Sequence, residues 1–326
     1  MKTFILISLI GLSAISWAPG HPDQSSTNHI LVDTIYMDME FIPKEKAAKL
    51  LRLEDAMSNK WNKFDITARL KGKEGDKNDL LEFISQQARD WTPEEIAFLR
   101  KSRDTINAVI HNRGLIIDFP EKIPMLKTTM NEESGAGGYT RDNYIVLIDK
   151  IKTAPQDVAT LLLAHETFHI LTRNDPEFRK KMYSVIGFTI LPHEVEFPQE
   201  LRDRIITNPD VIRHDSYATF TINGKKTDCV MATYTKEPYK GNQVMKYVNT
   251  GLVPIDKESG KVIEKDGKAV LYPITDAKDF YDKVGKNTYY TFDPEEILAE
   301  NFSLLLTNQL AVNDPEIIWA MEKICK

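Results

Sequence analysis

Apolar residues recur every three or four positions over several long stretches of the chain, a spacing that predicts helices. A capping box at Thr92-Pro93-Glu94-Glu95 opens one of them, and Asp293-Pro294-Glu295-Glu296 opens another. The predicted helices cover residues 43–64, 78–89, 92–112, 155–172, 176–187, 276–284 and 293–308, and one more follows residue 315.

Shorter apolar runs bounded by turn residues predict strands. Asn223-Gly224 is a strong hairpin signal and joins predicted strands at 217–222 and 227–234. A second hairpin is predicted at 137–148, with Gly138 and Tyr139 on a glycine-lined edge that can accept a peptide as an added strand. A flexible loop before a core strand is the alternative for this segment. The other predicted strands are 115–119, 125–130, 245–248, 261–264 and 270–272.

These elements predict an α+β fold with three parts after the first eighteen residues. Residues 19–120 form a mostly helical amino-terminal region, and residues 121–326 form a larger domain. A β-rich insertion at about 211–275 divides that domain. A chain of 326 residues is long enough to bury a sizeable core.

The first eighteen residues resemble a secretory signal peptide. Lys2 supplies the positive start, residues 4–15 are nearly all apolar, and Ser16-Trp17-Ala18 has the small-residue pattern of a cleavage site. An uncleaved anchor is the alternative. Residues 21–326 contain no apolar run of transmembrane length, so we expect a secreted or periplasmic protein without a stable membrane span.

Charge and cysteine content narrow the function further. A formal net charge of −6 argues against nucleic acid as a main partner, because no broad basic surface is implied. The two cysteines, Cys229 and Cys325, either form one disulfide or remain buried thiols, and the sequence leaves both possibilities open.

The segment His165-Glu166-Thr167-Phe168-His169 lies on one of the most apolar predicted helices and carries the clearest chemistry. Residues four apart share a helix face, so His165 and His169 can close on one metal ion. Glu166 lies close enough to accept a proton from a water at that ion. This is the H-E-x-x-H pattern of zinc hydrolases, which indicates one bound zinc ion.

A catalytic zinc usually has three protein ligands, and this segment supplies two. The residues after His169 lack the glycine and third histidine of the metzincin pattern. The best candidate for the third ligand lies on the later predicted helix, where Glu296 and Glu300 share a face. One of them can bind zinc while the other accepts the free N–H of a ligating histidine.

The combination of H-E-x-x-H with Glu296-Ile297-Leu298-Ala299-Glu300-Asn301-Phe302 resembles the gluzincin metallopeptidases, in particular the lethal-factor-type secreted peptidases. The resemblance implies a zincin-like catalytic domain with a mixed sheet and an active-site helix. It implies that Glu296 is the third zinc ligand and that Glu300 supports a ligating histidine without binding the metal. It also implies an edge strand that aligns the substrate. Glu295 and Glu300 stay open as alternative ligands.

The same family places a catalytic tyrosine shortly before the glutamate helix. Tyr289 occupies the corresponding position here, and Tyr290 follows it. His214, in the β-rich insertion, is another candidate donor to the oxyanion.

We therefore expect an exported zinc metallopeptidase that acts on a peptide or protein, with Glu166 as general base. A non-catalytic zinc-binding or interaction protein that keeps the metallopeptidase fold is the alternative. Zinc-dependent hydrolysis of a peptide-like bond, such as a cell-wall crosslink, is a further one.

Overall fold

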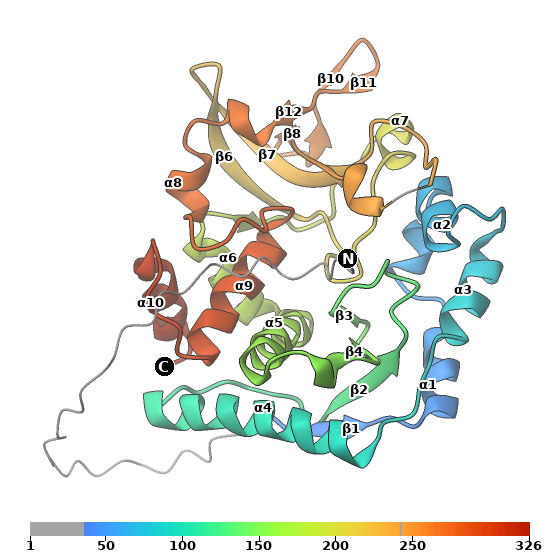
Figure 1. Ribbon diagram of the computed structural model, residues 1–326. Coiled ribbons are helices and arrows are strands. Elements are labelled where there is room, and N and C mark those ends of the chain that lie inside the picture. Colours follow the sequence, from blue (N-terminus) through green and yellow to red (C-terminus); the bar gives the residue numbers. More distant parts are fainter. Residues whose placement is uncertain (1–35, 242) are drawn as a thin grey trace, which may run out of the picture.

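The computed structural model describes residues 36–241 and 243–326, in which helices and sheets both contribute to an α+β protein (Figure 1). The predicted α+β class is confirmed. The predicted signal peptide at 1–18 lies outside the described residues. The helices are α1 Lys44–Leu51, α2 Lys63–Arg69, α3 Lys77–Ser85, α4 Pro93–Arg113, α5 Gln156–Asn174, α6 Pro176–Val185, α7 Gln199–Arg202, α8 Phe280–Val284, α9 Pro294–Leu306 and α10 Pro315–Ile324.

The strands fall into a four-stranded sheet, a larger second sheet and a small two-stranded ribbon. The first sheet holds β1 Met39–Phe41, β2 Ile123–Thr128, β3 Gly138–Arg141 and β4 Tyr144–Ile148. The second holds β5 Thr189–Ile190, β6 Ser216–Ile222, β7 Lys225–Tyr234, β8 Asn249–Asp256, β9 Lys261–Val262 and β12 Tyr272–Pro273, and the ribbon pairs β10 Glu264–Lys265 with β11 Lys268–Ala269.

The first sheet is mixed and ends in an open edge beside the central helix. Its order is β1-β2-β4-β3, with β1 and β4 parallel to β2 and β3 antiparallel to β4. Tyr139 pairs with Val146 across the β3–β4 hairpin. β3 therefore has β4 on one side only, and its other side faces α5 and the second half of the molecule (Figure 1).

Helix α5 lies at the centre of the molecule, between the first sheet and α9 (Figure 1). Its apolar residues surround it on most sides, which is why it is buried along nearly its whole length. Phe168 of α5 packs against Phe302 of α9, with ring centroids 5.3 Å apart. Ala299 is fully buried and lets the two helices approach closely.

Successive side chains of the second sheet face two different cores, as expected for strands whose side chains point alternately to opposite sides. Phe220 and Met231 face the central core that contains α5, whereas Val230 and Val253 face a smaller core under α7. Asn223 and Gly224 both have positive φ, 51° and 75°, which is the geometry that a tight two-residue hairpin requires.

The predicted helix at 43–64 is wrong as a single element. Asp55 and Ser58 bond each other's backbone N–H groups, both at 2.8 Å, and this turn ends the helical path after α1. Asn62 and Asp65 then form a capping box that starts α2.

Two predicted strands are also wrong. Residues 115–119 do not pair with another strand. The N–H of Leu115 donates to the carbonyl of Ile110 at the end of α4, and the N–H of Ile116 donates to the carbonyl of Cys325. Residues 244–246 form a 3-10 turn instead of a strand. The strand β8 that follows was not predicted from the sequence, because glycine and proline interrupt its apolar run.

Both cysteines are buried free thiols, so the disulfide alternative is not formed. Burial raises the pKa of Cys229 and of Cys325 to about 12. Among the helices of the described residues, none is long and apolar enough to span a membrane.

Candidate metal centre

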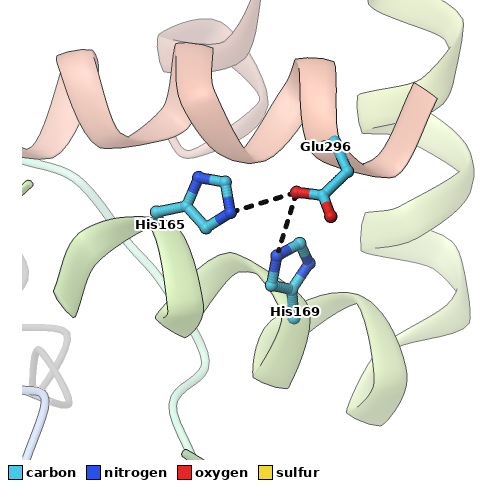
Figure 2. Close-up of side chains that lie close together, drawn as sticks. All are labelled: His165, His169 and Glu296. Atoms are coloured by element: carbon cyan, nitrogen blue, oxygen red, sulfur yellow. Dashed lines mark ion pairs between the residues drawn. The ribbon is translucent and has the colours of Figure 1, made fainter. Parts of the chain in front are cut away.

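Helix α5 presents His165 and His169 on the face that meets α9 (Figure 2). The two side chains are four residues apart and therefore one helical turn apart. Nε2 of His165 lies 3.2 Å from Oε2 of Glu296, and Nε2 of His169 lies 3.9 Å from the same oxygen. One donor atom from each of the three residues lies within 4.8 Å of the other two.

Helix α9 delivers Glu296 because its first turn is fixed. Asp293 accepts the N–H of Glu295 at 2.9 Å, and Pro294 occupies the first helical position. Glu296 then points at both histidines and is 1% exposed. Of the three glutamates that the sequence left open, Glu296 is the one placed between the imidazoles.

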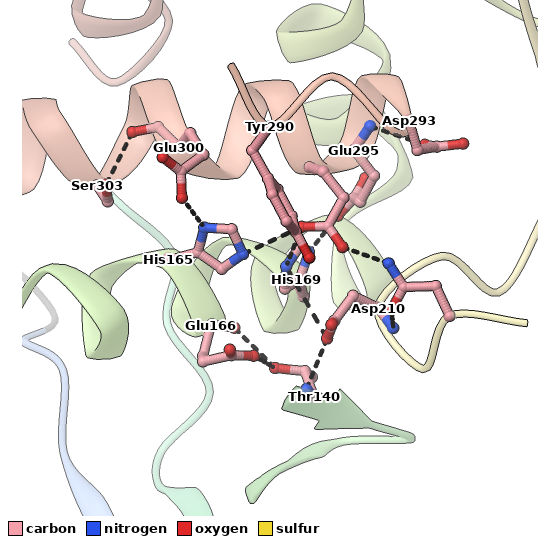
Figure 3. A network of polar contacts seen from close by, with 12 residues as sticks. Thr140, His165, Glu166, His169, Asp210, Tyr290, Asp293, Glu295, Glu300 and Ser303 are labelled. Carbon is pink, nitrogen blue, oxygen red and sulfur yellow. Dashed lines mark hydrogen bonds and ion pairs between the residues drawn. The ribbon is translucent and has the colours of Figure 1, made fainter. Parts of the chain in front are cut away.

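The other two glutamates each lie behind one histidine (Figure 3). Oε1 of Glu300 is 3.2 Å from Nδ1 of His165. Oε1 of Glu295 is 3.0 Å from Nδ1 of His169, and the same carboxylate accepts the hydroxyls of Thr172 and Tyr183, both at 2.6 Å. Carboxylates in this position fix the orientation and tautomer of ligating histidines. The sequence pointed to this role for Glu300 but considered Glu295 only as a ligand.

The three inward-facing residues fit a divalent cation. Nε2 of His169 and Oε2 of Glu296 are buried and have no hydrogen-bond partner within the described residues, which is unusual for buried polar atoms. Two donors on a tetrahedral zinc lie about 3.3 Å apart, given metal–ligand bonds of about 2.0–2.1 Å. The measured separations of 3.2 and 3.9 Å lie near this value. A set of two imidazole nitrogens and one carboxylate oxygen suits zinc.

The electrostatics of the cluster also favour binding of a cation. Burial lowers the pKa of His165, but Glu296 and Glu300 outweigh it, and the net pKa is raised well above its usual value. Burial raises the pKa of Glu166. Burial, together with the charges of Glu166 and Glu296, raises the pKa of Asp210 well above its usual value. So many buried acids in one place are destabilising unless a cation balances them.

Glu166 lies beside the three inward-facing residues and is held by the edge strand. Thr140 of β3 donates its hydroxyl to Oε2 of Glu166 at 2.8 Å (Figure 3). The other oxygen, Oε1, faces Gly138, where a Cβ atom would approach it to 3.2 Å. The carboxylate is thus oriented by one hydrogen bond and given room by one glycine. The sequence singled out Gly138 at this edge, whereas it assigned no role to Thr140 in the same predicted hairpin.

Of the two tyrosines before α9, Tyr290 lies beside the cluster, whereas the sequence favoured Tyr289. Tyr289 is 71% exposed, so most of its side chain is in contact with solvent. Tyr290 lies with its ring centroid 6.4 Å from that of His165, and Figure 3 shows its ring pointing into the cluster. The charge of Glu296, reinforced by burial, raises the pKa of Tyr290 well above its usual value, so its hydroxyl keeps its proton.

His214 and Tyr139 do not reach the cluster with their side chains. His214 packs against Phe197, with ring centroids 5.0 Å apart. Tyr139 points to the opposite face of the first sheet, where its hydroxyl lies 3.3 Å from Glu132. The contribution of Tyr139 to the edge is therefore its backbone.

The loop before the second sheet brings two residues that the sequence did not single out. Asn208 donates to Oε1 of Glu296. Asp210 accepts the backbone N–H of Thr140 at 2.6 Å, and its Oδ1 lies 3.9 Å from Nε2 of His169 (Figure 3). Asn208-Pro209-Asp210 is typical of a turn in the sequence, and no local signal indicates its contact with α5 and α9.

A cavity of about 230 Å³ opens along the edge of β3 next to this cluster. Gly138, Asp210 and Tyr290 are among its lining residues, together with apolar side chains such as Phe64 and Met245. The cavity therefore borders the neighbours of the three inward-facing residues, while those three residues do not line it.

A comparison with protein-family models finds no match, and neither curated proteins nor solved structures include a significant match to this chain.

Proposed function

We propose that the protein is an exported zinc-dependent peptidase of the gluzincin arrangement, with His165, His169 and Glu296 as zinc ligands and Glu166 as general base. The observation that carries the proposal is the division of the site. Two histidines from α5 and a glutamate from α9 converge, and a separate carboxylate lies between them and an open strand edge.

The surroundings of the ligands support a catalytic site over a purely structural one. A structural zinc site has four protein ligands and no need for a neighbouring base. Here Glu166 is oriented by Thr140 and faces Gly138 on the cavity side. Tyr290 adds a protonated hydroxyl to the same space.

A zinc ion bound by the three residues would lower the pKa of a water molecule and polarise a substrate carbonyl. Glu166 accepts the proton of the attacking water and delivers it to the leaving amine, so the C–N bond breaks as the amine becomes neutral. Tyr290 donates a hydrogen bond to the carbonyl oxygen as negative charge develops there. Glu295 and Glu300 hold the two histidines in orientation.

The open edge of β3 supplies the means to align an extended peptide. A peptide that adds to a sheet edge gains backbone hydrogen bonds and places alternate side chains into neighbouring pockets. Gly138 keeps this edge free of side-chain atoms close to Glu166. The cavity beside it has mainly apolar walls, which favour apolar side chains in the bound peptide.

One observation favours a second candidate, a zinc site without catalysis. Oδ1 of Asp210 lies 3.9 Å from Nε2 of His169, so Asp210 offers a fourth protein ligand that would close the coordination sphere.

The substitution Glu166→Gln separates the two candidates. We expect the purified wild-type protein to contain about one zinc per chain and to cleave unstructured peptides. Glu166→Gln should keep the zinc and lose at least about 100-fold in turnover, since it removes the base. Metal content is measured by mass spectrometry and turnover with a quenched fluorescent peptide library.

The matched control is Glu258→Gln, on an exposed turn of the second sheet. It should change neither metal content nor turnover. Equal turnover in wild type and Glu166→Gln would show that the base is misassigned, and zinc without cleavage in the wild type would favour the structural site.

A further inference from the structure

The open edge of β3 offers its hydrogen bonds at two positions only. Residues of an antiparallel pair alternate between bonding the neighbour and facing away from it. Gly137 accepts the N–H of Ile148 at 3.0 Å, so Tyr139, two residues later, also bonds towards β4. The backbone groups of Gly138 and Thr140 therefore face the open edge, and Gly138 also lines the cavity.

Asp210 already occupies one of these two positions. Its Oδ1 accepts the outward N–H of Thr140 at 2.6 Å, at the carboxyl end of β3. A peptide strand added to this edge can pair with Gly138 but cannot continue past Thr140 while this bond exists. The bound peptide therefore has to end near Asp210.

The loop that carries Asp210 is fixed in this position. Arg173 of α5 donates to the carbonyls of Pro209 and Asp210, at 2.7 and 3.1 Å. The N–H of Asp210 bonds the side chain of Asn208 at 3.0 Å, and Asn208 in turn donates to Glu296. The side chain of Asp210 is only 10% exposed. The loop is thus tied to both helices of the candidate centre.

The hydrogen-bonding chemistry of Asp210 determines which end of a peptide fits. Its carboxyl group already accepts the N–H of Thr140 and lies next to Glu166 and His169. A terminal ammonium group donates hydrogen bonds that the oxygens of Asp210 can accept, whereas a terminal carboxylate has no donor to offer them. An amino terminus next to Thr140 also means that the peptide runs antiparallel to β3, with its remaining residues towards Gly138 and the cavity.

The distances place the first peptide bond at the candidate centre. An ammonium nitrogen about 2.8 Å from Asp210 has its own carbonyl carbon about 2.5 Å further along the chain. Oδ1 of Asp210 is 3.9 Å from Nε2 of His169, whose unpartnered nitrogen faces the expected metal position. The carbonyl of the first residue therefore falls within reach of the ligands and of Glu166.

We infer that Asp210 binds the free α-ammonium group of a peptide, so that the protein is an aminopeptidase that removes residues from the amino terminus. This inference rests on the proposed function. In each cycle water adds across the first peptide bond: the hydroxyl joins the carbonyl of the released amino acid. The proton passes through Glu166 to the amine of the shortened peptide. That amine is a new amino terminus, so the product is again a substrate.

The test compares one unstructured peptide with a free amino terminus and its N-acetylated counterpart, using the zinc-loaded wild type. We expect a ladder of products shortened by one residue from the free peptide and cleavage at least about 10-fold slower for the acetylated one. Asp210→Asn should lower kcat/KM for the free peptide by about 10- to 100-fold and remove most of the difference between the free and the acetylated peptide. Asp118→Asn, an exposed acid far from the site, is the control.

Several outcomes would overturn the inference. Equal cleavage of both peptides, or cleavage at internal bonds, would leave a peptidase without amino-terminal anchoring. Faster cleavage of both peptides by Asp210→Asn would identify Asp210 as a blocking group.

A binding measurement separates failure of the anchor from failure of the proposed function. Calorimetry with the zinc-loaded Glu166→Gln variant should give about 10-fold tighter binding of the free peptide than of the acetylated one. Equal affinities would overturn the anchor even if the wild type cleaved neither peptide. A clear preference without any cleavage would keep the anchor and reject the peptidase.

Discussion

Each histidine of the candidate centre meets a carboxylate at both ring nitrogens. His165 lies between Glu296 and Glu300, and His169 lies between Glu296 and Glu295. The imidazoles therefore cannot rotate or exchange tautomers without losing a buried contact. Such outer carboxylates raise the basicity of metal ligands and reduce the entropy that metal binding has to overcome.

The outer carboxylates should matter for metal affinity. Glu295→Gln and Glu300→Gln should each weaken zinc binding by about 10- to 100-fold, measured by competition with a chromogenic chelator. Glu296→Gln should weaken it further, because it removes a ligand. Glu316→Gln, exposed on α10, should have no effect. If Glu295→Gln weakened zinc binding more than Glu296→Gln did, Glu295 would be the ligand and Glu296 the supporting carboxylate.

At the scale of elements, the site depends on how α5, α9 and β3 pack together. The aromatic contact between Phe168 and Phe302 fixes the two helices, and Thr140 connects β3 to Glu166. Gly138 allows the strand to approach α5 closely, since a Cβ there would meet Leu147 at 2.9 Å as well as Glu166. Small residues at such contacts set the distance between elements.

Gly138→Ala should therefore impair turnover more than stability. The added methyl would displace Glu166 or the strand by a few tenths of an ångström, and we expect about a 10-fold loss in kcat with zinc retained. Gly137→Ala is the matched control, because its Cβ would meet only the flexible side chain of Leu162, at 3.2 Å. Equal kcat values for both variants would contradict this role of Gly138.

The helices of the site were predictable because their signals are local. The spacing of His165 and His169 and the cap before Glu296 belong to single helices, and the structure places both as the pattern indicates. The choice between Tyr289 and Tyr290 was not predictable, because the segment before α9 is irregular and has no period that assigns faces. Asp210 reaches the site through tertiary packing alone, so its sequence carries no signal for that contact.

At the scale of the whole molecule, the candidate centre joins parts that lie far apart in the sequence. The first sheet and α5 come from one half of the chain, and α9 follows the second sheet (Figure 1). A metal ion bound by both helices would link these halves and stabilise the folded state by mass action.

Metal removal should accordingly lower thermal stability. With zinc at about 1,000 times its Kd, binding stabilises by about 4 kcal/mol, so chelation should lower Tm by about 5–10 °C in calorimetry. Readdition of zinc should restore the Tm. The Glu296→Gln variant should respond much less to either treatment, and an unchanged wild-type Tm after verified zinc removal would argue against a linking metal.

The separation of the ligands along the chain also has a consequence for biosynthesis. His165 and His169 leave the ribosome long before Glu296, because the whole second sheet is synthesised in between. A nascent chain that stops before α9 has the helix with the proposed base and two proposed ligands but cannot complete the candidate centre. The proposed metal site therefore forms only after the second sheet and α9 have both been made.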